Sequence, residues 1–372
     1  MRALTLWTAR IVPIVVLLLA ASLPAPEAES ENGWWRVYFT SPGAPASRKN
    51  ENSPDAAFRR LVDHSSRSIY GAFYDISDET IAARLADARR RGVDVRIVTE
   101  RDNANKAPLR ALVQAGIPVV TDSGPALMHH KFAVVDGAFV WTGSYNLTPN
   151  GARKNDNNAI VIYSRDLAEI FTAEFMEMHR DGVFGNRKEF GAFASFGKKY
   201  HARIGTTDIN AYFSPDDNIE RIILKRLAKA ERSVRFMAFS FTSDPLGEEL
   251  VRLHKKGVDV RGVMEKTGTN GRDSEYIKMK IEGIPVRVAS GIGRMHHKVM
   301  IIDESVVITG SFNFSRGANT RNDENILIIH NEEIARTYLS EFTRLYAASG
   351  GAAPPARHRP RRRKHITHGG AP

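Results

Sequence analysis

Cysteine is absent from all 372 residues. Its absence excludes disulfides, thiolate nucleophiles and cysteine-ligated zinc, so core packing must hold the fold. Long apolar runs are also scarce, and the one from Ile11 to about Ala21 is too short for a typical membrane span. It follows Arg2 and Arg10 and leads into small residues and prolines, as in a secretory signal peptide. We therefore expect residues 1–28 to be the signal peptide of a secreted or periplasmic protein, with an uncleaved N-terminal anchor as the alternative.

Acidic residues are missing from the end of the chain. Residues 351–372 carry six Arg and Lys residues and no acid, so they account for more than half of the net charge of +11, and the rest of the chain is only mildly basic. A stretch of Pro, Gly and Arg with almost no apolar residues predicts a disordered basic tail over 348–372. Such a tail could bind an anionic membrane surface, nucleic acid or another polyanion, or it could simply keep the protein soluble.

The sequence repeats itself over most of its length. Matching segments are 165 residues apart early in the repeat and 167 apart from Gly116 and Gly283 onward. Each copy is long enough to be a domain, which predicts a first domain at 33–180, a linker at 181–207 and a second domain at 208–347. The matching pairs are RSIYGAFYDISD (67–78) with RSVRFMAFSFTSD (232–244), RRGVDVRIVTE (90–100) with KKGVDVRGVME (255–265), AGIPVV (115–120) with EGIPVR (282–287), and KNDNNAIVIYS (154–164) with RNDENILIIHN (321–331).

Apolar runs alternate with amphipathic stretches inside each copy. Segments 68–74, 93–99 and 130–136 are short, apolar and bounded by turn residues, which indicates strands. Segments 80–92 and 167–179 place apolar residues three and four apart, as amphipathic helices do. The alternation predicts an α/β fold of two tandem homologous sandwich domains, each a mixed sheet flanked by helices.

One pattern in the repeat carries chemistry. MHHKFAVVDGAFVWTGSYN (128–146) and MHHKVMIIDESVVITGSFN (295–313) each contain a His, a Lys two residues later, an Asp five beyond that, and a Gly-Ser-x-Asn seven residues after the Asp. The residues are His129, Lys131, Asp136, Ser144 and Asn146 in the first copy, and His296, Lys298, Asp303, Ser311 and Asn313 in the second.

The residue types suit a phosphate group. Side chains alternate along a strand, so His129 and Lys131 should share a face, whereas His130 and Asp136 should point away. Lys supplies a compact positive charge for an anionic oxygen, and His can attack or transfer a proton. Ser and Asn add neutral donors, and a Lys beside the His disfavours a metal dication. We therefore expect a site without metal or cofactor, in which the two Asp residues, Asp136 and Asp303, hold the Lys or a loop in place.

The two motifs, HxKxxxxD followed by GSxN, resemble those of the phospholipase D superfamily, and the resemblance covers most of 33–347. It implies a monomer with an internal pseudo-dimer, in which two motif strands face each other across a pseudo-twofold axis and form one active site. It also implies that one His forms a covalent phosphohistidine while the other protonates the leaving oxygen and then activates water. The residues implied as catalytic are His129, Lys131, Asp136, His296, Lys298 and Asp303, with Ser144, Asn146, Ser311 and Asn313 supporting the phosphate.

The copies differ at one position behind the imidazoles. The family places an acidic residue there, and Glu324 of NDEN fits, whereas NDNN puts Asn157 in the first copy. A carboxylate stabilises a protonated imidazole better than an amide does, so the His backed by Glu324 should be the general acid. If each residue serves its own copy, His129 attacks and His296 protonates. Pairing across the domain interface would reverse these roles, and Asp156 could instead substitute for the acidic residue that the first copy lacks.

The substrate is less determined than the chemistry. Export, a basic tail and a linker bearing Phe184, Phe190, Phe193 and Phe196 favour a secreted phospholipase D-type enzyme that hydrolyses phospholipid head groups. Those rings could instead stack on bases or simply pack between the domains. The alternatives are a metal-independent endonuclease with the same mechanism and an inactive polyanion-binding protein.

Overall fold

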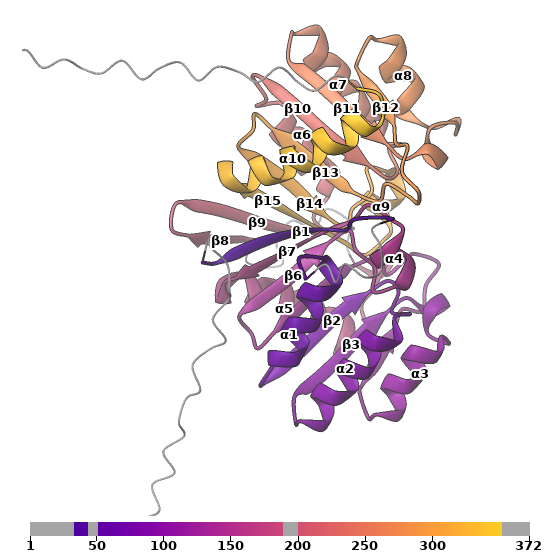
Figure 1. The fold of residues 1–372 in the computed structure, drawn as a ribbon, viewed down its shortest axis with the longest axis vertical. Helices are drawn as coiled ribbons and strands as arrows, with labels where there is room; N and C mark the ends of the chain where they lie inside the picture. The colour runs from indigo at the N-terminus through magenta and orange to yellow at the C-terminus, as the bar shows by residue number, and fades with distance from the viewer. Residues whose placement is uncertain (1–32, 44–50, 189–199, 352–372) are drawn as a thin grey trace, which may run out of the picture.

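The computed structural model describes residues 33–43, 51–188 and 200–351. The expected signal peptide lies outside the described residues, and so does the expected basic tail apart from residues 348–351, of which Ala348 still belongs to the last helix. Figure 1 shows two sheets, one in the lower half of the view and one in the upper half, each accompanied by helices. This arrangement confirms the prediction of two tandem α/β domains with mixed sheets.

The first sheet has seven strands among the described residues, in the order β1-β7-β6-β5-β2-β3-β4. β2, β3 and β4 run parallel, and the remaining neighbours pair antiparallel. Its strands are β1 (Trp35–Phe39), β2 (Ser68–Phe73), β3 (Asp94–Thr99), β4 (Val119–Thr121), β5 (Lys131–Val135), β6 (Phe139–Gly143) and β7 (Asn158–Tyr163). Its helices are α1 (Pro54–His64), α2 (Glu79–Arg90), α3 (Ala107–Gln114), α4 (Pro149–Arg153) and α5 (Arg165–His179).

The second sheet repeats this topology and adds one strand, in the order β12-β11-β10-β13-β14-β15-β9-β8 for the part of the chain described. Its strands are β8 (His201–Ile204), β9 (Thr207–Ser214), β10 (Ser233–Ala238), β11 (Asp259–Met264), β12 (Val286–Val288), β13 (Lys298–Ile302), β14 (Val306–Gly310) and β15 (Glu324–His330). Its helices are α6 (Ile219–Leu227), α7 (Asp244–Lys255), α8 (Glu275–Ile281), α9 (Arg316–Thr320) and α10 (Glu332–Ala348). The hairpin β8–β9 begins inside the segment predicted as a linker.

Equivalent helices begin at equivalent caps. Asp78 accepts hydrogen bonds from the first turn of α2, and Ser243 does the same for α7. Ser164 caps α5 and Asn331 caps α10. Each such cap is worth about 1 kcal/mol, so short polar residues that precede the apolar periodicity set the helix starts.

The two halves share a central core. Helices α5 and α10 each contact strands of both sheets. The Phe171 ring of α5 lies 5.0 Å from Phe132 of the first sheet and 5.2 Å from Phe213 of the second, measured between ring centroids. Phe184, from the predicted linker, is buried in the same core, whereas the other three linker rings lie outside the described residues. Fully burying one such side chain contributes about 1.5–3 kcal/mol, so this core fixes how the halves are docked.

Short backbone bridges join the motif of each half to the other half. Met128 pairs with Asp323, and Asp156 pairs with Met295. The amides of His129 and His296 donate to the carbonyls of Asp323 and Asp156, each at 2.9 Å. Each MHHK segment therefore lies beside the NDxN segment of the opposite half.

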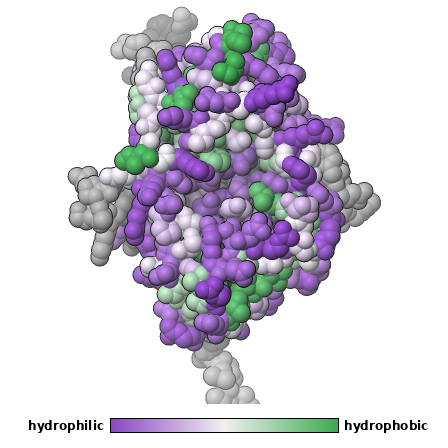
Figure 2. All heavy atoms as spheres, turned by 90° about the vertical axis from the view of Figure 1, so that its right-hand side faces the viewer, coloured by the Kyte–Doolittle hydropathy of each residue, from purple (hydrophilic) through white to green (hydrophobic). Residues whose placement is uncertain are grey.

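Figure 2 looks onto the side where α4 and α9 lie in Figure 1. Both helices follow directly after a Gly-Ser-x-Asn segment. The face is mostly hydrophilic, and its hydrophobic residues are scattered rather than joined in one patch. Among the described residues no helix is both long and apolar enough to cross a membrane.

Candidate active site

His129 and His296 lie two residues before β5 and β13, and both are buried, with 8% of their surface exposed. Their partners cross the interface. Nδ1 of His129 lies 2.8 Å from Oε2 of Glu324, and Nδ1 of His296 lies 2.9 Å from Oδ1 of Asn157. The assignment of His129 as the attacking residue assumed that each His pairs with the residue of its own copy. That pairing does not occur. The backbone bridges explain why, because they place each imidazole beside the NDxN segment of the other half.

The surroundings of His296 define its tautomer. Its Nδ1 faces two acceptors, Oδ1 of Asn157 and the carbonyl of Ser144 at 3.0 Å. The Asn157 amide cannot turn its nitrogen toward the ring, because that nitrogen donates to the carbonyl of Gly151 at 3.1 Å. Nδ1 of His296 therefore carries the hydrogen, which leaves Nε2 with a free lone pair.

Burial and charge act together on the first imidazole and its partner. Burial raises the pKa of Glu324 to about 7, and burial together with the ammonium groups of Lys131 and Lys298 lowers the pKa of His129 well below its usual value. Burial and the same two lysines also lower the pKa of His296. The carboxyl of Glu324 can hold a proton beside His129 near neutral pH, whereas the Asn157 amide has no such capacity.

The two lysines are held alike in both halves. Nζ of Lys131 donates to the carbonyl of His129, and Nζ of Lys298 donates to that of His296, each at 2.8 Å. Burial lowers the pKa of Lys131 to about 7 despite the opposing charges of Glu324 and Asp75. Burial and the charge of Lys131 lower the pKa of Lys298 too. An anion entering the site would therefore find ammonium groups that are poorly compensated and would stabilise their charged form.

Sequence reasoning missed two aromatic residues in the site. The Tyr74 ring packs on the edge of His129 at 5.0 Å between centroids, and the Phe239 ring packs on His296 at 4.6 Å. The same rings lie under the ammonium groups of Lys131 and Lys298. They occupy matching positions in the two copies directly after β2 and β10, so an aromatic residue in both copies was the available signal.

The Ser and Asn residues of the motifs have different roles. Ser144 donates to Oδ1 of Asn157 at 3.0 Å and accepts from the Asn158 amide, and Ser311 accepts from the amide of Asn325. Both hydroxyls therefore position the residues behind the imidazoles. Asn146 and Asn313 are half-buried, and within the described residues their Oδ1 atoms have no hydrogen-bond partner.

Asp136 and Asp303 lie away from the imidazoles. Five residues of strand separate Asp136 from Lys131, or about 16 Å at the usual rise per residue. Asp136 accepts from the backbone amides of 66–68, and Asp303 accepts from those of 231–233. The assignment of these two residues as catalytic is therefore corrected. They hold a loop, as their strand parity indicated, and not the motif lysine.

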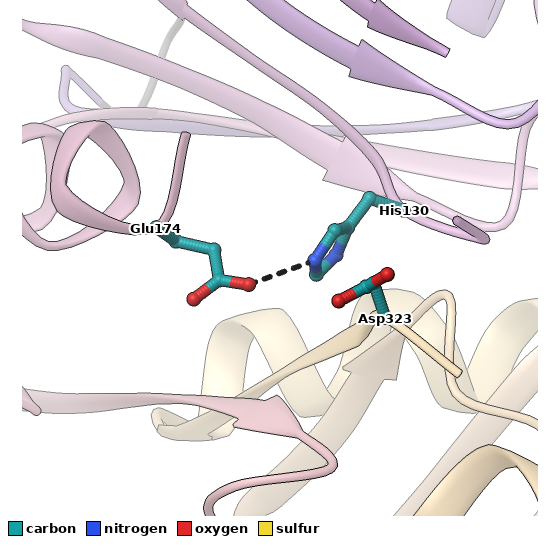
Figure 3. A group of neighbouring side chains, drawn as sticks. All are labelled: His130, Glu174 and Asp323. Carbon is teal, nitrogen blue, oxygen red and sulfur yellow. Dashed lines mark hydrogen bonds and ion pairs between the residues drawn. The ribbon is translucent and has the colours of Figure 1, made fainter. Parts of the chain in front are cut away.

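His130 points away from the catalytic centre, as the alternation predicts, into a buried ion network. Its Nε2 lies 3.0 Å from Oε1 of Glu174, and Figure 3 shows Asp323 facing the same ring. The ligand atoms of these three residues lie within 4.8 Å of one another, close enough for a metal ion. However, the Lys188 ammonium contacts Glu174 and lies 3.2 Å from Asp323. The site fits this internal cation rather than a metal dication.

The second half contains the equivalent network with a different cation. His297 lies 3.2 Å from Glu341, and Arg344 bridges Glu341 and Asp156 at 2.7 Å each. Arg344 comes from α10 itself, whereas Lys188 comes from the segment after α5. Strand alternation predicted only that His130 points away from the motif face, and the structure places both His130 and His297 in networks that join the halves.

Residues 58–179 and 223–346 each match the family model described as "Cardiolipin synthase, PLD-like domain". The chain belongs to the phospholipase D superfamily. The predicted resemblance is thereby confirmed, and the two matched segments are the two halves described above.

This phospholipase D superfamily member is similar to curated proteins and to solved structures over part or most of its length. The mitochondrial cardiolipin hydrolase of Canis lupus familiaris is 37% identical over 124 residues, which are 33% of this chain and 49% of that protein, so the match spans about half of its length. The phospholipase D of Rickettsia conorii is 30% identical over 141 residues, which are 38% of this chain and 70% of that protein. The crystal structure of phosphatidylserine synthase from Haemophilus influenzae has a TM-score of 0.62 at 14% identity, covering 79% of this chain and 84% of its own, which shows a common fold.

Proposed function

We propose that this protein is a phospholipase D-type phosphodiesterase that hydrolyses phospholipids through a phosphohistidine on His296. The observation that carries the proposal is the unequal backing of two imidazoles in one site: Glu324 behind His129 and Asn157 behind His296. The names of the relatives, a cardiolipin hydrolase and a phospholipase D, support a phospholipid substrate.

In the first step, the Nε2 lone pair of His296 attacks phosphorus, and a P–N bond forms as the bond to the leaving alcohol breaks. His129 gives its Nε2 proton to that alcohol while the proton held by the Glu324 carboxyl passes to its Nδ1, so the imidazole stays neutral. In the second step, His129 takes a proton from water, the water oxygen attacks phosphorus, and the P–N bond breaks. Lys131 and Lys298, with the amides of Asn146 and Asn313, stabilise the charge on the phosphoryl oxygens.

Trapping tests the two roles separately. A substrate with an activated leaving group, such as a nitrophenyl phosphodiester, does not need a general acid. His129→Asn should therefore still accumulate phosphoenzyme on His296, and His296→Asn should accumulate none. Label on His129 in the His296→Asn protein would contradict the assignment.

The substrate class is tested with and without chelator. Vesicles of phosphatidylglycerol, phosphatidylcholine or cardiolipin should be hydrolysed, and chelator should not reduce the rate. Cleavage of plasmid DNA but of none of the lipids would favour the endonuclease alternative. Binding without turnover of either would favour the inactive polyanion-binding alternative.

We also propose that residues 1–28 direct export, on the sequence pattern alone. Fractionation of a producing bacterium should find the protein in the periplasm or medium without this segment. Retention in the cytoplasm at full length would contradict export. The basic tail should strengthen binding to anionic vesicles, so deleting 352–372 should weaken binding at low salt without changing turnover of a soluble substrate.

A further inference from the structure

The residues beside the two imidazoles differ between the halves, and we call the side of the site that each half forms its wall. The residue two positions before each His is Leu127 in the first half and Arg294 in the second. The guanidinium of Arg294 lies 6.0 Å from the Phe239 ring centroid, and that ring packs on His296. Arg294 is exposed, and only the Phe239 ring lies between its guanidinium and the imidazole of His296. The first half has no cation at the equivalent position.

The backbone of Arg294 is held between the two halves. Its amide donates to Oδ1 of Asn155 at 3.1 Å, and its carbonyl accepts from the amide of Asp156 at 2.9 Å. The preceding Gly293 packs so closely on the carbonyl of Lys154 that a Cβ atom there would lie 2.0 Å from the oxygen. The position of Arg294 beside Phe239 is thus set by contacts with the opposite half.

Two cations that follow β3 in the first half are paired with carboxylates. Lys106 lies 2.7 Å from Asp75, and Arg101 lies 3.5 Å from Asp102. In the second half, Asp75 and Asp102 are replaced by Ser240 and Thr267. Within the described ranges, Arg294 has no carboxylate partner. Among the residues that the structure describes, the second half's side of the site therefore carries an unpaired cation at Arg294.

We propose that Arg294 binds a second phosphate of the substrate, and that the protein thereby prefers a phospholipid with two phosphodiesters joined by a short bridge, as in cardiolipin. This inference rests on the proposed hydrolysis of phospholipids. A guanidinium is the side chain best shaped for a bidentate phosphate contact. Lys131 and Lys298 are buried beside the imidazoles and bind the phosphate under attack. A second phosphate therefore needs a separate cation outside this buried set.

The test is Arg294→Leu, which gives the second wall the residue that the first wall has. The kcat/KM on cardiolipin should fall about 10- to 100-fold, the scale of a lost charge-assisted hydrogen bond pair, and that on phosphatidylglycerol should change less than about twofold. Arg294→Lys should retain part of the preference. Arg110→Leu removes the same charge from an exposed site on α3 and should leave both values unchanged. An equal loss on both lipids, or no loss on either, would overturn the proposal.

A binding measurement separates this inference from the proposed function. Calorimetry with propane-1,3-diol bisphosphate and with the monophosphate should show tighter binding of the bisphosphate to wild type. This difference should disappear in Arg294→Leu. Failure of wild type to hydrolyse any lipid would sink the proposed function, whereas equal binding of the two soluble phosphates to wild type would sink the second-phosphate site.

Discussion

The first half of the molecule backs its catalytic imidazole with a carboxylate from the second half, whereas the second half receives only an amide in return. The backbone around both imidazoles is otherwise equivalent, with matching bridges, matching lysine contacts and an aromatic ring against each His. One substitution between the copies is therefore enough to give two symmetric imidazoles different protonation chemistry. In the mechanism proposed above, the duplicated fold supplies the geometry, and a single side chain supplies the direction of the reaction.

The ion networks behind the active site differ in the same way. Lys188 is almost fully buried and serves three carboxylates, whereas the side chain of Arg344 is 49% exposed. Burial opposes the charge of Lys188, but Glu174 and Asp323 outweigh it and raise the pKa of Lys188 well above the ordinary value. The first network thus depends on one buried cation, and the second depends on a cation that water can partly replace.

Removing either imidazole should have the largest effect. If the halves form one site, His129→Ala and His296→Ala should each lower kcat on a phospholipid by at least about 10⁴-fold, because the two groups act as a unit. Steady-state hydrolysis measures this directly. About half of the activity remaining in each variant would instead show two independent sites, and the comparison between halves would lose its meaning.

The ion networks should differ in stability. Lys188→Met leaves Glu174 and Asp323 buried without their cation and should cost about 3–5 kcal/mol of unfolding free energy. Arg344→Met should cost less, about 1–2 kcal/mol, because the Arg344 side chain is 49% exposed and water can enter the position that it leaves. Urea unfolding of both variants measures the difference.

The pH dependence of Lys188→Met offers a check. Without the lysine, the pKa of the buried Asp323 carboxyl should rise further above its unfolded value. Its protonated form is then favoured by folding, so the loss of stability should shrink as the pH is lowered. Equal losses for the two variants at every pH would contradict the contrast between the networks.

Exchanging the partners of the imidazoles should reverse their roles. Glu324→Gln should lower kcat for a poor leaving group by about 10²- to 10³-fold, the range of general acid catalysis, and should affect an activated leaving group much less. In the double variant Glu324→Asn with Asn157→Glu, the trapped phosphoryl group should move from His296 to His129. Mass spectrometry of the phosphopeptide identifies the site, and label that stays on His296 would show that something other than these partners sets the direction.

Anion binding should produce the smallest of these effects: the protein should take up less than about one proton for each anion that it binds. At pH 8, Lys131, with a pKa of about 7, is mostly neutral, and a bound anion favours its charged form. Sulfate is a suitable probe because it does not titrate in this range. Calorimetry in two buffers of different ionisation heat should show proton uptake at pH 8 and less at pH 6. Lys131→Met should reduce the uptake, and equal heats in both buffers would contradict the lowered pKa.

Much of this protein could be predicted from its sequence. The repeat, the alternation of apolar runs and the two motifs indicate two α/β domains, because periodicity and spacing are local properties of the chain. Strand parity also separates His129 and Lys131 from His130 and Asp136, since neighbouring side chains on a strand point to opposite faces. The sequence alone also shows that the second copy has Glu324 where the first has Asn157.

The tertiary structure decided which residues meet. Parity assigns a side chain to a face but does not say which domain lies opposite, so the sequence could not show that Glu324 serves His129. The insertion of Lys188 beside His130 and the stacking of Arg294 over Phe239 likewise depend on how the two halves dock through their shared core. Docking is a sum of many weak, non-local contacts, and for that reason it alone determined which imidazole has the carboxylate.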